Sequence, residues 1–278
     1  MDQIKPIVTK IAERTWCLNE YNLVNAFLIE GDTKAVLIDS GCGIADFSKV
    51  AESLTALPIT VILTHGHPDH AGGLYYFPEA KAYMGQEDLA VEKVMACDNR
   101  FRKYYIENRV EFRFPGEGHK EALLSMLPPD PASVPLSRTL PLTEDMTFDL
   151  GGRVLDVLHT PGHSDGSYCI FDDNSHILFS GDTVNHSIIL MRQKDDSLVL
   201  VEQYHETLEK IWKQQDRFDC LAIGHDGITV NKQIVKDYLD LTEGLLDGSI
   251  VGEYEEKGFR KGDVARLGLA ELWYRCDA

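Results

Sequence analysis

Residues 64–70 read Thr-His-Gly-His-Pro-Asp-His. This stretch follows the apolar run 59–63, Ile-Thr-Val-Ile-Leu, which predicts a buried strand over Ile59–Thr64. Gly66 and Pro68 disfavour both a continued strand and a regular helix, so the sequence predicts a turn directly after the strand. Three histidines and one aspartate are therefore gathered on a single turn.

Neutral imidazole nitrogens and a carboxylate oxygen are ligands of zinc and other first-row metals. Because neighbouring residues on a turn point in different directions, His65 and His67 can serve one metal while Asp69 and His70 serve a second. The alternative is a polar loop whose histidines bond to backbone or water. The density of donors in this stretch favours metal binding.

Further candidate ligands follow strand-like runs later in the chain. His163 follows the run 154–158, Asp182 follows 176–179, and His225 follows 220–223. Glycine or proline flanks each of them, which lets the backbone approach a shared centre closely. Together they complete two metal sites if Asp182 bridges the two ions.

The order His-x-His-x-Asp-His, then His163, Asp182 and His225, resembles the metallo-β-lactamase superfamily, in particular its glyoxalase II and lactonase-like branch. The resemblance implies an α+β fold, a four-layer αββα sandwich with the metal site at the edge of the two sheets. It implies metal 1 ligands His65, His67 and His163, and metal 2 ligands Asp69, His70 and His225. It also implies Asp182 as the bridging carboxylate and Asp39 as a residue that orients ligands through hydrogen bonds.

This centre predicts a hydrolase with two divalent metal ions. Zinc is the expected metal, with iron or manganese as alternatives. Two such ions lower the pKa of a shared water, and the resulting metal-bridging hydroxide attacks the carbonyl of an ester, thioester or lactone. Asp69 and Asp182 are the predicted catalytic residues, with Asp69 orienting the nucleophile or moving its proton. The predicted partner is a small, anionic substrate.

Three other functions remain open. A persulfide dioxygenase of the same fold would use one iron held by His65, His163 and Asp182. A phosphodiesterase or a β-lactam hydrolase would use the same two-metal site, although Asp182 stands where many β-lactamases of the superfamily have cysteine. Residues 183–191, Thr-Val-Asn-His-Ser-Ile-Ile-Leu-Met, do not match the Gly-Cys-Gly-Arg run of glyoxalase II. Metal content and oxygen uptake discriminate the hydrolases from the dioxygenase.

Composition excludes several classes of partner. The 278 residues include 27 basic and 45 acidic side chains, giving a net charge of −18. This charge argues against a general nucleic-acid binder and against docking on an anionic membrane. The sequence contains no uninterrupted run of 18 apolar residues, so it predicts no membrane span. The 6 cysteines are scattered, which indicates free thiols and a cytoplasmic protein.

Strand-like and helix-like runs alternate along the chain, which predicts layered sheets covered by helices. We expect one domain over 1–278, with an insert or lid at about 97–135. The expected strands are 11–18, 25–30, 35–39, 59–64, 147–149, 154–158, 168–171, 176–180, 220–223 and 270–275, and the expected helices 44–57, 86–95, 201–214 and 231–246.

The segment 98–114 is locally basic and aromatic in an acidic chain. Its cations are Arg100, Arg102, Lys103, Arg109 and Arg113. One interpretation is a lid that receives an anionic, partly apolar substrate. The other is an amphipathic helix with a solvated face or a homodimer contact. The candidate pocket residues are Tyr104, Tyr105, Arg109 and His186.

Overall fold

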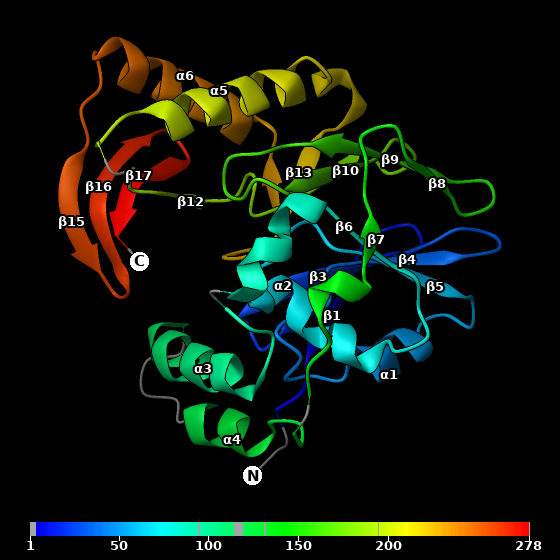
Figure 1. The fold of residues 1–278 in the computed structure, drawn as a ribbon. Coiled ribbons are helices and arrows are strands. Elements are labelled where there is room, and N and C mark those ends of the chain that lie inside the picture. Colours follow the sequence, from blue (N-terminus) through cyan, green and yellow to red (C-terminus); the bar gives the residue numbers. More distant parts are fainter. Residues whose placement is uncertain (1–3, 94, 114–118, 131, 194, 278) are drawn as a thin grey trace. The chain divides into compact units, whose positions relative to one another are not determined.

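The computed structural model describes residues 4–93, 95–113, 119–130, 132–193 and 195–277. The chain divides into two compact units, Met1–Val157 and Leu158–Ala278, and each is described by itself. Figure 1 shows the first unit in blue to green and the second in green to red. The expectation of a single domain stays a prediction.

The first unit is built on a seven-stranded sheet in the order β1-β2-β3-β4-β5-β6-β7. Strands β1 to β4 pair antiparallel, and β4 to β7 pair parallel. Strands β3 and β4 are buried along nearly their whole length, as continuous apolar runs in a central sheet position require. The strands are β1 (Ile7–Ala12), β2 (Thr15–Glu20), β3 (Val24–Glu30), β4 (Ala35–Ile38), β5 (Ile59–Ile62), β6 (Ala82–Met84) and β7 (Leu140–Pro141).

Short helices connect these strands, and two of them contribute to the candidate site. Residues 68–71, which the sequence predicts as part of a turn, instead form the short helix α2. It starts at Pro68, where the missing backbone N–H of proline costs nothing and its fixed φ suits the first helical turn. The apolar side of α3 buries Ile106 and Val110. The helices are α1 (Phe47–Glu52), α2 (Pro68–Ala71), α3 (Asn99–Arg113) and α4 (His119–Ser125), with 3-10 turns at Gly72–Tyr76, Gln86–Lys93 and Leu136–Arg138.

At the end of the first unit, β8 (Thr147–Asp149) pairs antiparallel with the start of β9 (Val154–His159). The second unit then contains strands in the order β14-β13-β11-β10, with β11 and β13 parallel. A further sheet has the order β12-β17-β16-β15. The strands are β10 (Tyr168–Asp172), β11 (Ile177–Gly181), β12 (Ser187–Met191), β13 (Cys220–Ile223), β14 (Thr229–Asn231), β15 (Glu253–Lys257), β16 (Arg260–Leu267) and β17 (Ala270–Asp277).

Two amphipathic helices, α5 (Val199–Trp212) and α6 (Gln233–Asp247), supply much of the apolar core of the second unit. A 3-10 turn at Gln215–Arg217 follows α5. Tyr204 and Tyr238, one from each helix, are fully buried, and their rings meet edge to face at 5.8 Å between centroids. Helix α6 ends at Gly248, whose φ of +79° is the left-handed conformation that glycine adopts without strain.

The expected α+β class is confirmed, but several element boundaries differ from the sequence-based prediction. The strand expected over 11–18 is a hairpin of β1 and β2, which turns at Arg14 with φ +51°. The helix expected over 44–57 covers only Phe47–Glu52, and the one expected over 86–95 is a 3-10 helix. The segment 97–135 contains α3 and α4, while 114–118 and 131 lie outside the described residues.

None of the helices within the described ranges has the length and apolar character needed to cross a lipid bilayer.

Candidate metal centre

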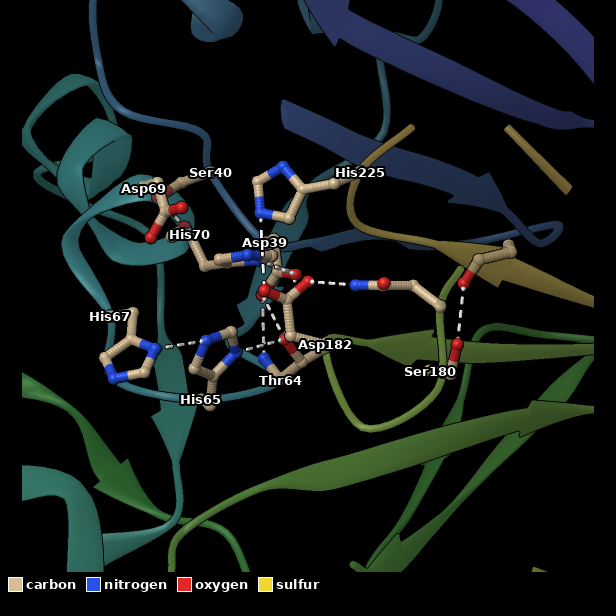
Figure 2. Close-up of polar contacts among 12 residues, drawn as sticks. Asp39, Ser40, Thr64, His65, His67, Asp69, His70, Ser180, Asp182 and His225 are labelled. Atoms are coloured by element: carbon tan, nitrogen blue, oxygen red, sulfur yellow. Dashed lines mark hydrogen bonds and ion pairs between the residues drawn. The ribbon is translucent and has the colours of Figure 1, made fainter. Parts of the chain in front are cut away.

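Asp39 is the centre of a buried hydrogen-bond network in the first unit. It directly follows β4 and is 1% exposed, with φ +59°, a left-handed backbone that aspartate tolerates better than most residues. Its Oδ1 accepts the Thr64 backbone N–H at 2.7 Å, and its Oδ2 lies 2.8 Å from Nδ1 of His70. Figure 2 shows these contacts at the end of the central strands. A carboxylate that only accepts requires His70 to carry its proton on Nδ1.

Thr64 extends this network to His65. Its hydroxyl lies 3.0 and 2.9 Å from the two Asp39 oxygens and 3.1 Å from Nδ1 of His65. A hydroxyl has one proton, which it donates to the carboxylate, so it accepts from His65 Nδ1. Asp39 thereby sets the tautomer of both histidines and leaves the lone pair on Nε2, as ligating histidines require.

His65 and His67 point ring nitrogens at each other. Nε2 of His65 lies 3.0 Å from Nδ1 of His67. Two nitrogens bound at about 2.0–2.1 Å to one tetrahedral ion lie about 3.3 Å apart, so this spacing suits a shared metal. Gly66, between them, donates its N–H to the buried carboxylate of Asp88 at 2.8 Å. A Cβ on Gly66 would lie 2.8 Å from the Asp88 Cβ, so this turn requires glycine.

Asp69, in the first turn of α2, accepts a hydrogen bond from α3. The Tyr105 hydroxyl donates to its Oδ2 at 2.9 Å. Burial raises the pKa of Tyr105 well above its usual range, and the negative charge of Asp69 adds to this effect. The phenol is therefore a donor at neutral pH. In the first unit, the structure thus brings together His65, His67 and His70 with Asp39 and Thr64, and it links Asp69 to Tyr105.

The second unit contains the other three candidate ligands, with His163 and His225 close to Asp182. Its Oδ2 lies 3.3 Å from Nε2 of His225 and 3.8 Å from Nε2 of His163. Nδ1 of His163 lies 3.2 Å from the carbonyl of Ile189. Because a carbonyl only accepts, that nitrogen carries the proton and Nε2 carries the lone pair. The ring atom facing Asp182 is therefore the one suited to a metal.

The loop that carries Asp182 is held by one of its own side chains and by two helices. Asn185 donates its side-chain N–H to Asp182 Oδ1 at 3.2 Å. The Tyr238 hydroxyl donates to the Asn185 carbonyl at 2.9 Å, and the Tyr204 hydroxyl to the Thr183 carbonyl at 2.8 Å. Helices α5 and α6 thus fix the backbone directly after Asp182.

The candidate pocket residues differ in their surroundings. Tyr104 is 55% exposed, whereas Tyr105 is 4% exposed and bonded to Asp69. The Arg109 guanidinium stacks over the Tyr105 ring at 5.2 Å from its centroid. His186 is half-buried in the turn before β12. Their contacts with a substrate stay predictions.

The sequence analysis names Asp39 as a residue that orients ligands, but it misses Thr64, Asp88 and Asn185. Thr64 stands directly before the histidine stretch, and its hydroxyl was the available signal. Asp88 and Asn185 are single polar residues with no local pattern, so only the fold reveals that they bond to Gly66 and Asp182.

The donor set fits a first-row metal. The described residues include groups of histidine and carboxylate side chains that could hold a metal ion. The candidate ligands offer imidazole nitrogens and carboxylate oxygens, and three imidazoles (His65, His70 and His163) have their tautomer fixed by a partner.

Comparison with known proteins gives a consistent assignment. A family model described as the metallo-beta-lactamase superfamily matches residues 21–89 and 94–225. The acyl-coenzyme A thioesterase MBLAC2 of Gallus gallus is 31% identical over 172 residues, which cover 59% of this chain and 58% of that protein. An atrochrysone carboxyl ACP thioesterase of Passalora fulva is 24% identical over 229 residues, covering 77% of this chain and 52% of that protein. The chain thus spans between half and three fifths of these relatives.

Solved structures share the fold at low identity. An archaeal metallo-beta-lactamase superfamily protein from Sulfolobus tokodaii matches with a TM-score of 0.51 and 21% identity, covering 85% of this chain and 86% of that chain. The DIM-1 metallo-beta-lactamase matches with a TM-score of 0.58 and 15% identity, covering 88% of this chain and 100% of that chain. These likenesses confirm the predicted fold.

Proposed function

Because the chain belongs to the metallo-β-lactamase superfamily, we propose that it is a metal-dependent hydrolase of acyl thioesters. The family supports the metal-dependent chemistry. The thioester is favoured over the ester and the lactone because the similar proteins from Gallus gallus and Passalora fulva are named thioesterases. The proposal concerns this chain, which covers part of each relative.

The proposed ligands are those that the sequence predicts. His65, His67 and His163 bind one ion; Asp69, His70 and His225 bind the other; and Asp182 bridges them. Zinc is the proposed metal, with iron and manganese as alternatives that nitrogen and oxygen donors also accept. This set requires both units, so we propose that residues 1–278 act as one functional domain.

Divalent ions held by these residues would supply an acidified water as nucleophile and would polarise the carbonyl under attack. The side chains of this protein do the rest. Asp39 keeps the protons of His65 and His70 on Nδ1, the latter directly and the former through Thr64. Asp69 would orient the nucleophile and accept its proton.

We propose that the substrate is an acyl group on an anionic carrier. Arg109 offers a guanidinium held against the Tyr105 ring, and that ring is joined to Asp69 through its hydroxyl. A guanidinium fixed by stacking loses little freedom when it binds a phosphate or carboxylate. Tyr104 and His186 are the proposed apolar and polar contacts of the same substrate.

The observation that carries the proposal is the sharing of Asp39 between two histidines. A buried carboxylate that fixes the proton on two imidazoles prepares both Nε2 atoms as ligands, a geometry that plain polar loops do not need. Absence of nucleic-acid and membrane binding, a cytoplasmic location and a homodimer stay predictions.

The test combines metal analysis with a substrate panel. We expect close to two ions per chain and turnover of acyl thioesters above lactones, phosphodiesters and β-lactams. The Asp182→Ala variant should lose one or both ions and all hydrolysis. One tightly held iron with thiol-dependent oxygen consumption would instead establish the dioxygenase, and full activity of Asp182→Ala would remove the bridging assignment.

A further inference from the structure

One face of α3 is attached to the backbone around the candidate ligands of the first unit. Arg102 on this helix is fully buried. Its Nε donates to the Cys42 carbonyl at 2.8 Å and its Nη2 to the Gly72 carbonyl at 2.9 Å. Cys42 lies three residues after Asp39, and Gly72 lies two residues after His70. A third bond, from Nη1 to the Ala132 carbonyl at 2.6 Å, joins the other end of the 97–135 segment.

Tyr105 lies on the same face, about one turn further along the helix. Its hydroxyl donates to Asp69 Oδ2 at 2.9 Å, and its side chain is 4% exposed. Arg109, a further turn along, stacks on the Tyr105 ring. The spacing of 102, 105 and 109 therefore places these three side chains on one stripe of α3, where Tyr105 contacts Asp69 of α2 and Arg109 stacks on Tyr105.

We propose that α3 is a fixed wall of the metal site and that Tyr105 is a positioning residue for Asp69. This inference rests on the proposed function, because it assigns Asp69 as a ligand. The Tyr105 hydroxyl binds one carboxylate oxygen, so it selects the rotation of the carboxylate and makes Asp69 a one-oxygen ligand. Partners of this kind are worth roughly 10- to 100-fold in metal affinity.

The proposal changes the role of the 97–135 segment. A lid that opens over the site would have to break the buried bonds of Arg102 and the bond from Tyr105 to Asp69. Opening would therefore exchange several buried hydrogen bonds for bonds to water and expose the apolar side of α3 that buries Ile106 and Val110. Tyr105 is thus assigned to the metal ligand, and the substrate contact on this helix falls to Tyr104 and Arg109.

The main test compares the Tyr105→Phe variant with the Tyr21→Phe variant. Both substitutions remove one hydroxyl from a buried tyrosine of the first unit, and Tyr21 lies on the turn between β2 and β3. Zinc affinity is measured by competition with a chromophoric chelator, and the Co²⁺-loaded proteins are compared by visible absorption. We expect Tyr105→Phe to lose about 10- to 100-fold in affinity for one of two ions and to change the Co²⁺ spectrum. Tyr21→Phe should match the wild type in both.

A second measurement does not depend on a variant. Hydrogen exchange of the wild-type protein should show α3 amides protected to a degree similar to those of β4 and β5. Fast exchange of α3 with retained metal would overturn the fixed wall. Equal zinc affinity of Tyr105→Phe and wild type would overturn the positioning role. A wild-type protein that binds no metal would instead overturn the proposed function, so the two failures are distinguishable.

Discussion

Asp39 and His70 share a hydrogen bond of 2.8 Å between Oδ2 and Nδ1, and both side chains are buried, at 1% and 0% exposure. Asp39 also accepts from the backbone and hydroxyl of Thr64. Its two oxygens therefore face donors only. This position therefore requires a carboxylate, because an uncharged polar side chain would not offer two accepting oxygens.

The Asp39→Asn variant tests this requirement. Asparagine offers one accepting oxygen and one donating NH₂. Because both Asp39 oxygens face donors, the NH₂ group must face a donor, either at Thr64 or at His70. If the NH₂ faces His70, the imidazole moves its proton to Nε2, the atom proposed as ligand. We expect zinc affinity to fall by roughly 10- to 100-fold, measured by chelator competition.

The matched control is Asp145→Asn, an exposed aspartate of the same unit, which should bind zinc as the wild type does. Unchanged affinity in Asp39→Asn, with the protein folded by circular dichroism, would show that the Asp39 network does not prepare the histidines.

The cluster of candidate ligands was predictable from the sequence, because His65, His67, Asp69 and His70 lie within six residues and need no tertiary information. Asp39 was predictable through the resemblance to the superfamily. The hydrogen bonds that orient these side chains were not. Arg102 lies 60 residues from Cys42 and 30 from Gly72. Such contacts depend on packing, which no local pattern in the sequence encodes.

The boundaries of regular elements failed for a related reason. Residues 11–18 contain several strand-favouring side chains, yet Arg14 adopts a left-handed φ in the hairpin that pairs β1 with β2. The strands β15 and β16 were missed because β15 is the polar edge Glu-Tyr-Glu-Glu-Lys, which lacks the apolar alternation of a half-buried strand.

Asn185 is expected to tune Asp182, the carboxylate that we propose as the bridge. In the Asn185→Ala variant, Asp182 loses the donor at 3.2 Å that fixes its Oδ1. The carboxylate gains rotational freedom, and we expect about a tenfold or greater loss of metal affinity with little loss of fold. Metal content after dialysis against graded chelator measures it.

Asn174→Ala, at an exposed turn of the second unit, is the control. If Asn185→Ala and the wild type lost their metal at the same chelator concentration, Asn185 would have no influence on metal binding by Asp182.

Arg102 is expected to dominate the stability of the first unit. The Arg102→Ala variant leaves the carbonyls of Cys42, Gly72 and Ala132 without this donor. Each buried polar group left unsatisfied costs about 1–3 kcal/mol, so we expect the free energy of unfolding to fall by on the order of 3 kcal/mol or more. Urea denaturation followed by far-UV circular dichroism measures this loss.

Lys103→Ala, on the solvent side of the same helix, should change stability by less than about 0.5 kcal/mol. A similar small effect for Arg102→Ala would show that α3 is only loosely attached.

Glu271 gives a prediction for the pH dependence of the second unit. Burial alone raises the pKa of this carboxyl, but hydrogen bonds from Ser187 and Trp273, together with Arg266, outweigh it and lower the pKa to about 2 from 4.5. The folded protein thus binds this proton more weakly than the unfolded chain does. The stabilisation is present above pH 4.5 and is lost as pH falls toward 2. After discounting for solvent, it amounts to on the order of 2 kcal/mol.

The measurement is the difference in unfolding free energy between wild type and Glu271→Gln as a function of pH. Because glutamine does not titrate, this difference should shrink as the pH falls from 4.5 toward 2. Glu253→Gln, exposed on the edge strand β15, should follow the wild-type curve. Ser187, which bonds to Glu271, is the first residue of β12 and lies five residues after Asp182. A difference that stays constant with pH would mean that the ionised Glu271 carboxylate does not stabilise this sheet.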